Sequence, residues 1–115
     1  MKYMLLIYSN EAGMQNASKA EAEQIMGAYS AYSEAMAKAG VMVGADRLQR
    51  STAATTVRTT GGKTQVLDGP YAESKEQLGG YFLIDVPDLD AALSWASRCP
   101  GASQGVVEVR PIWAM

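Results

Sequence analysis

The chain has 115 residues, of which 48% are hydrophobic and 19% charged, and ten Lys and Arg against twelve Asp and Glu give a formal charge of −2. This length suits one domain, residues 1–115, with one modest core, and the apolar share predicts a folded rather than a disordered chain. Because no run of like charges forms a stripe that could neutralise a phosphate backbone, direct nucleic-acid binding is not expected.

Cysteine and histidine usage excludes two further classes of site. The single cysteine, Cys99, cannot form an intramolecular disulfide, and the chain has no histidine. A structural zinc site needs four Cys or His ligands, so we expect neither a metal nor a cofactor. No cleavage pattern follows Met1-Lys2, and the longest apolar runs are far shorter than the roughly 20 residues that cross a bilayer. We therefore expect a cytoplasmic protein without a membrane segment.

The first part of the chain predicts a strand, a helix and a second strand. Lys2 to Tyr8 is a continuous apolar run of strand length, typical of a strand buried on both faces. Ser18 and Glu21 form a capping box at the start of a helix expected from Ser18 to Ala39. Residues 41–45 predict a second buried strand. The apolar stripe of the helix consists of Ile25, Tyr29, Tyr32 and Met36.

The middle of the chain predicts a β-hairpin. Two runs rich in β-branched residues, Thr55 to Thr60 and Lys63 to Leu67, flank the dipeptide Gly61-Gly62. A two-residue glycine turn between such runs favours a tight hairpin, with Val57 opposite Val66.

The last part of the chain predicts a loop, a strand, a helix and a final strand. Asp68-Gly69-Pro70 ends the hairpin, and the polar segment from Tyr71 to Gln77 predicts a loop. Tyr81 to Val86 predicts a strand, and Asp88 is a suitable N-cap for the next helix. Residues 107–110 alternate between valine and charged side chains, typical of a strand with one buried face. The expected inward face of the second helix consists of Leu89, Ala92, Leu93 and Ala96.

The order of these elements predicts an α+β fold of the ferredoxin-like type, a split βαβ sandwich with an inserted β-hairpin. Both helices would then cover one face of the sheet and leave the other face bare. A chain this small would expose aliphatic strand surface there unless a second copy covers it. We therefore expect a homodimer, assembled in the manner of the dimeric α/β barrels.

One long segment carries a family resemblance. The residues from Asp68 to Tyr81, DGPYAESKEQLGGY, resemble the signature of the YCII-related family in its DGPF branch, with Tyr71 where phenylalanine is usual. Three other stretches resemble that branch too, so the similarity covers nearly the whole chain: Gly40 to Leu48, Arg98-Cys99-Pro100, and Val107 to Pro111. The resemblance implies a ferredoxin-like fold and dimers whose sheets pack face to face.

The resemblance implies less about function. Some YCII proteins resemble small lyases and isomerases, a dehydrochlorinase among them, in which a helix histidine and an aspartate after the second strand have the acid–base role. The histidine position would fall near Gly27, and Asp46 is only a loose match for the aspartate, so this pair does not carry over. Proteins of the DGPF branch are often encoded beside extracytoplasmic-function sigma factors, which implies a link to regulation.

The loop after the hairpin contains a concentration of charge, with Asp68, Glu73, Lys75 and Glu76 close together. Loops between β elements often carry binding groups, but turn chemistry and a solvated helical turn explain the same residues. A carboxylate base would need a raised pKa, whereas Lys75 beside Glu76 favours the ionised form. This neighbour argues against catalysis at the loop.

A second group of charged residues lies on or next to predicted strands. If some of them line a dimer cleft, Asp46, Arg47 and their neighbours would bind a small molecule that carries a carboxylate. The alternative is that these residues form ion pairs across a solvent-exposed face of the sheet. Cys99 is expected to pack rather than react, because the negative end of the helix dipole disfavours its thiolate. The full group is Asp46, Arg47, Arg58, Glu108 and Arg110.

Three hypotheses for function stay open. The first is a dimer with little or no catalytic activity that binds a small anionic metabolite in a cleft edged by the loop from Asp68 to Glu76, with a regulatory role. The second is a lyase or isomerase with Asp68 or Asp46 as proton acceptor and Lys75 or an arginine as electrophilic stabiliser. The third is a module that binds a protein partner such as a sigma factor. The sequence assigns no catalytic residue.

Overall fold

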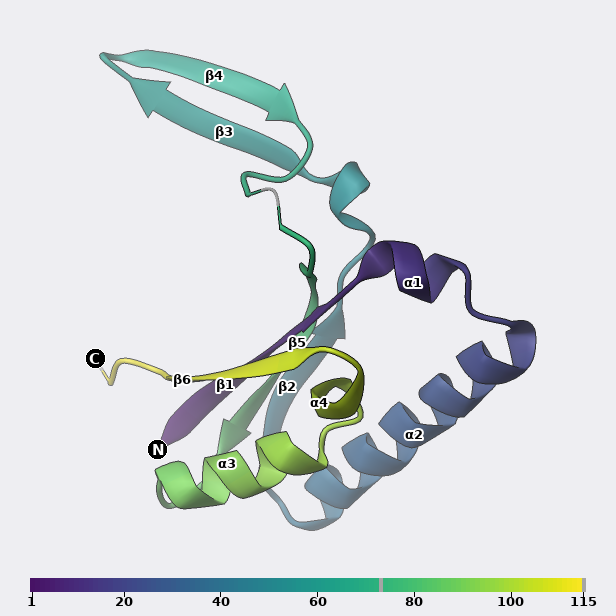
Figure 1. The fold of residues 1–115 in the computed structure, drawn as a ribbon. Helices are drawn as coiled ribbons and strands as arrows, with labels where there is room; N and C mark the ends of the chain where they lie inside the picture. Colours follow the sequence, from purple (N-terminus) through teal and green to yellow (C-terminus); the bar gives the residue numbers. More distant parts are fainter. Residues whose placement is uncertain (73, 115) are drawn as a thin grey trace.

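The computed structural model describes residues 1–72 and 74–114 and contains a four-stranded sheet, two main helices and a separate β-hairpin (Figure 1). The elements in chain order are β1 (Lys2–Ser9), α1 (Glu11–Gln15), α2 (Lys19–Lys38), β2 (Met42–Arg47), the 3-10 turn η1 (Ser51–Ala53), β3 (Thr55–Thr60), β4 (Lys63–Asp68), β5 (Gln77–Asp85), α3 (Leu89–Arg98), α4 (Gly101–Gln104) and β6 (Val106–Pro111).

The main sheet is antiparallel with the strand order β2-β5-β1-β6, and β3 and β4 pair only with each other. This order is that of a ferredoxin-like sandwich, so the predicted α+β class and the inserted hairpin are confirmed. Leu5 of β1 lies opposite Phe82 on one side and Val109 on the other, which places β1 at the centre of the sheet.

The core lies between the sheet and the two main helices. Tyr3, Leu5 and Ile7 of β1 point toward the helices and are buried. Tyr32 and Met36 of α2 belong to the same apolar cluster, as do Ala92 and Ala96 of α3. Both helices therefore cover one face of the sheet, as predicted. Of the stripe expected on the first helix, Tyr29, Tyr32 and Met36 face the core, whereas Ile25 does not belong to the core cluster.

Side-chain caps fix where the helices begin and end. The Ser18 hydroxyl accepts a hydrogen bond of 3.1 Å from the Glu21 N–H, and the Asp88 carboxylate accepts one of 2.9 Å from the Ala91 N–H. Gly40 follows α2 with a φ of 71°, a left-handed conformation that favours glycine and ends the helix. The predicted N-caps Ser18 and Asp88 are confirmed.

Several local predictions differ from the structure. β1 is buried on one face only, and β2 is an edge strand whose Val43 is 48% exposed, because an apolar run does not show whether a second layer covers the strand. Leu89 and Leu93 of α3 are about half exposed. The small Ala92 and Ala96 face the sheet instead, and half-buried Trp95 packs against Tyr32 with ring centroids 6.1 Å apart.

The second face of the sheet lies away from α2 and α3 (Figure 1). We call it the open sheet face. Its apolar side chains are partly exposed rather than buried, in contrast to those on the helix side. By strand register it includes Met4, Leu6, Tyr8, Tyr81, Leu83, Val106, Glu108 and Arg110.

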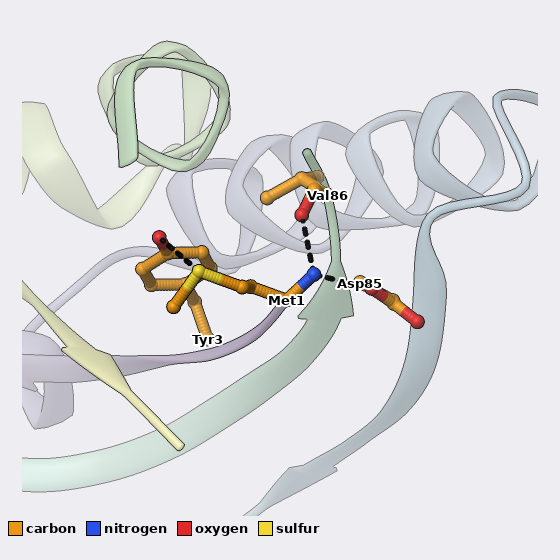
Figure 2. Close-up of polar contacts among 4 residues, drawn as sticks. All are labelled: Met1, Tyr3, Asp85 and Val86. Carbon is orange, nitrogen blue, oxygen red and sulfur yellow. Dashed lines mark hydrogen bonds and ion pairs between the residues drawn. The ribbon is translucent and has the colours of Figure 1, made fainter. Parts of the chain in front are cut away.

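The amino terminus is held against the end of β5 (Figure 2). The Met1 ammonium group donates a hydrogen bond of 2.9 Å to the Val86 carbonyl and forms an ion pair of 3.2 Å with Asp85. The Tyr3 hydroxyl donates to the Met1 sulfur at 3.6 Å. Within the described part of the chain, no helix has the length and apolar character needed to span a membrane.

Candidate functional site

The carboxyl end of β2 lies against the start of β5, and Gly80 of β5 allows the two strands to approach closely. A Cβ atom on Gly80 would lie 2.8 Å from the carbonyl oxygen of Asp46, too close for any side chain without movement. The Leu48 N–H donates to the Gly79 carbonyl at 2.9 Å and continues the pairing past the strand end. This register places Asp46 directly opposite Tyr81.

Asp46 and Tyr81 form a hydrogen-bonded pair on the open sheet face. The Tyr81 hydroxyl donates to the Asp46 carboxylate at 2.8 Å. This hydrogen bond and the negative charge of the carboxylate raise the pKa of Tyr81, because both stabilise the protonated phenol. The pair therefore presents a phenolic proton beside a carboxylate, with Asp46 exposed and Tyr81 partly exposed.

The pair belongs to one row of side chains that crosses the open sheet face. The register aligns Asp46, Tyr81, Leu6 and Glu108 across the four strands. At the far edge, Arg110 Nε lies 3.8 Å from Glu108 Oε2. The open sheet face thus has an apolar centre and charged groups at its edges, an arrangement typical of protein interfaces.

After the end of β2, the segment between β2 and β3 forms a shallow, open hollow of about 510 Å³. We call it the arginine hollow, since Arg47 and Arg50 both line it. One terminal nitrogen of Arg47 lies 3.6 Å from the Met26 sulfur of α2. Among residues 1–72 and 74–114, neither arginine takes part in an ion pair. The lining residues are Arg47, Leu48, Gln49, Arg50, Thr52 and Ala53.

The shape of the arginine hollow depends on a contact with Glu11, which lies near the amino terminus. Both carboxylate oxygens of Glu11 accept hydrogen bonds from Ser51, one from its N–H and one from its hydroxyl, each at 2.7 Å. The Glu11 N–H in turn donates to the Gln77 side-chain oxygen at 3.0 Å. Glu11 therefore joins the turn that lines the hollow to the start of β5.

The charged segment after β4 contains no helix or strand among its described residues, as the predicted loop requires. Asp68 ends β4 opposite Thr55 and is exposed, as is Lys75. The Ser74 hydroxyl donates to the carbonyl of half-buried Glu76. Glu73 lies outside the described residues. The Gly69 N–H donates to the Ala54 carbonyl at 2.7 Å, so the start of this loop is tied to the segment that lines the arginine hollow.

The structure separates the residues that the sequence grouped. Asp46 and Arg47 are neighbours at the end of β2, but strand alternation directs them to opposite faces of the sheet. Glu108 and Arg110 lie on the open sheet face with Asp46. Arg58 stacks over the ring of Tyr71 at 5.5 Å, outside both groups.

Cys99 packs in the core, as expected. It is 3% exposed, and burial raises the pKa of its thiol. No three or more His, Cys, Asp or Glu side chains gather into a metal site among the residues that the structure describes.

Three residues of the site were missed from the sequence. Tyr81 was assigned only to a strand, although its position next to Gly79-Gly80 was a signal of close strand contact. Arg50 lies in a segment without periodicity, and Glu11 contacts a residue 40 positions away. Such a long-range contact leaves no local pattern in the sequence.

Comparison with known proteins identifies the family. The model of the YCII-related domain matches residues 1–115. The chain belongs to the YCII-related family. It is also 43% identical over 114 residues to an uncharacterized protein of Rhizobium meliloti (strain 1021), a match that covers 97% of this chain and 92% of that protein. The YCII-related fold is thus the scaffold on which the arginine hollow and the Asp46–Tyr81 pair lie.

Proposed function

We propose that this YCII-related protein is a cytoplasmic homodimer that binds a small anionic metabolite at the base of its β-hairpin. The observation that carries the proposal is the arginine hollow, in which Arg47 and Arg50 line an open space of about 510 Å³. This is a volume within the usual range of small-molecule sites. The expected loop from Asp68 to Glu76 begins beside it, through the hydrogen bond between Gly69 and Ala54.

The chemistry of the lining favours a carboxylate. Guanidinium groups bind carboxylates through two parallel hydrogen bonds, and such charge-assisted bonds are stronger than neutral ones. Thr52 and Gln49 add neutral donors, while Leu48 and Ala53 supply apolar surface for a short carbon skeleton. We therefore favour a small organic acid over a nucleotide, for which the sequence has no phosphate-binding motif.

The homodimer is supported by the open sheet face. Met4, Leu6 and Leu83 lie at its centre and remain partly exposed in the single chain. The charged groups lie at its edges, so a second copy could cover the apolar centre and leave the charges in water. A sheet of one copy would then face the sheet of the other, as the family resemblance implies.

A thermal-shift screen with benzoate, succinate and 4-hydroxybenzoate tests the ligand site. The wild type is compared with Arg47→Gln, Arg50→Gln and, as a control that loses the same unit of charge, Arg98→Gln on α3. A ligand at 100 times its dissociation constant stabilises the folded state by about 2.7 kcal/mol, which is readily measured. We expect an acid to raise the melting temperature of the wild type and of Arg98→Gln, and to lose most of this effect in the two hollow variants.

A second comparison separates the hollow from the loop. The double variant Asp68→Ala, Lys75→Ala should keep the response if the acid binds to Arg47 and Arg50, and should lose it if the loop itself is the site. No response of the wild type to any of the three acids at 10 mM would count against the anion-binding proposal as a whole.

The Asp46–Tyr81 pair supports a second candidate function, proton transfer in a lyase or isomerase. A carboxylate with a phenol hydroxyl at 2.8 Å supplies a proton acceptor and a proton donor on one surface. In D₂O, such an enzyme should exchange the acidic C–H protons of a probe such as 2-oxobutyrate, as followed by NMR. Asp46→Asn should abolish the exchange while Asp68→Asn leaves it unchanged. Equal rates with and without wild-type protein would argue against this candidate.

Two further hypotheses rest on the family resemblance. One is a regulatory link to an extracytoplasmic-function sigma factor, and the other is a role as a protein-interaction module. Co-purification of the full chain with such a factor at micromolar concentration tests both. A stable complex would support them, and its absence would count against them.

A further inference from the structure

The β3–β4 hairpin extends away from the main sheet and the helices (Figure 1). All residues of both strands are exposed except Thr56, which is half buried. Val57 and Val66 face each other across the hairpin and are each 62% exposed, and Leu67 is 61% exposed. The hairpin thus presents apolar side chains to water without a partner within the described chain.

A hairpin of this kind is not expected to be stable by itself. An isolated two-stranded ribbon is marginal in water, and stable ones pack against further strands or a helix. The turn Gly61-Gly62 has φ angles of 58° and 79°, as a tight hairpin requires, so the hairpin is well formed locally. What it lacks is a covered face.

The total exposed surface indicates how much covering is missing. The chain exposes 8076 Å², whereas a monomeric protein of 12.3 kDa exposes about 6,100 Å². The excess of roughly 2,000 Å² per chain exceeds the surface of about 800 Å² that each partner buries in a standard interface. The radius of gyration of 16.1 Å likewise exceeds the value of about 13 Å for a compact domain of this length.

The two faces of the hairpin differ in character. The face of Val57 and Val66 carries, between the base and the turn, only threonines besides these valines: Thr55, Thr59 and Thr64, with Asp68 at the base. The opposite face carries Arg58, Lys63 and Gln65, together with Thr56, Thr60 and Leu67. One face is therefore suited to contact with protein and the other to contact with water.

We propose that the β3–β4 hairpin is an arm that packs on a second copy of this chain through its Val57 and Val66 face, with the two arms exchanged across a two-fold axis. The inference rests on the dimer of the proposed function and adds the arm to its interface. A second copy is the occupant because the same chain has a second incompletely covered surface, the open sheet face, and an isologous contact covers both surfaces in both copies. The surface excess has the size that such a contact needs.

The base of the arm is held in a fixed direction. Gly69 and Ala54 join its two ends through a hydrogen bond of 2.7 Å, and the Thr56 hydroxyl donates to the Gly69 carbonyl at 2.7 Å. On the body side, Glu11 holds Ser51, just before the arm begins. An arm fixed in this way loses little freedom when it docks.

Sedimentation equilibrium of three full-length proteins tests the arm. Val66→Lys places a positive charge among the valines and threonines of the Val57 and Val66 face, while Gln65→Lys places the same charge one residue away on the opposite face. The loss of one buried valine weakens the affinity about tenfold, and a two-fold dimer contains this valine twice. We therefore expect a dimer dissociation constant about 100-fold higher for Val66→Lys than for Gln65→Lys. Circular dichroism checks that both variants fold.

Hydrogen exchange of the wild-type hairpin amides gives a second readout that needs no variant. We expect the hairpin amides to be protected at concentrations where the dimer forms and to exchange faster on dilution below its dissociation constant. A wild-type dimer with equal dissociation constants for both variants, or with hairpin exchange independent of concentration, would refute the arm while the dimer itself stands. A monomeric wild type at 100 µM would refute both the arm and the dimer, and would leave the acid screen as an independent test of the arginine hollow.

Discussion

Removal of the Glu11 carboxylate should weaken both the stability of the protein and the arginine hollow. Glu11 accepts two hydrogen bonds from Ser51, each of 2.7 Å, and thereby fixes the turn that lines the hollow. Glu11→Ala removes both bonds at once. Ser51 would then keep its N–H and hydroxyl without these acceptors.

The magnitude follows from the environment of the carboxylate. A hydrogen bond to a charged group contributes about 1.5–3 kcal/mol when it is well shielded. Glu11 is only partly buried, so water can replace part of each bond, and about 1 kcal/mol for each is a more suitable value. We expect Glu11→Ala to lower the free energy of unfolding by about 2 kcal/mol and the melting temperature by about 8 °C.

Urea denaturation of Glu11→Ala measures this loss against Glu23→Ala, which removes an equally charged side chain from the exposed side of α2. The control should change the free energy of unfolding by less than about 0.5 kcal/mol. If Glu11→Ala also changed stability by less than this amount, the contact between Glu11 and Ser51 would have no role in holding the hollow. The response to benzoate in the thermal-shift assay should weaken in Glu11→Ala but not in the control Glu23→Ala.

Two further predictions concern the strand contact and the core. Gly80→Ala should destabilise the protein by about 2 kcal/mol or more, because its Cβ would lie 2.8 Å from a backbone oxygen. Gly27→Ala, whose Cβ would have no atom within 4 Å, should instead stabilise α2 by about 0.5–1 kcal/mol. Urea denaturation of both variants measures the two effects, and equal effects would contradict the prediction. Burial raises the pKa of Tyr29 to about 12, so the unfolded tyrosine ionises first and stability should fall as pH rises from 10 to 12. Tyr29→Phe should show a smaller fall over this interval in denaturation curves, and an unchanged fall would show that Tyr29 does not contribute.

The fold was predictable from the sequence because its signals are local. The N-caps Ser18 and Asp88, most of the stripe of α2 and the Gly61-Gly62 turn each depend on residues within one element, and the structure confirms them. The alternation of Val107 and Val109 with charged neighbours likewise predicted which side of β6 faces the core.

The site was less predictable because its contacts join distant residues. Tyr81 meets Asp46 across 35 positions, and Glu11 meets Ser51 across 40. The burial of a strand also depends on its position in the sheet and on what covers it, and neither can be read from the strand's own residues. For this reason β2 was expected to be buried, whereas it is an edge strand. The predicted loop at Asp68 was right in position, but the arginines that line a hollow lie just before the hairpin rather than after it.

The most direct test of the central claim is an NMR titration of the isotope-labelled full-length protein with benzoate, in which the backbone amides and arginine side chains are followed individually. The account predicts that the largest shifts occur at residues 47–53, with Arg47 and Arg50 foremost, and that they saturate with one benzoate per chain. Shifts confined to residues 68–76, or no saturable shift at any described position, would contradict it.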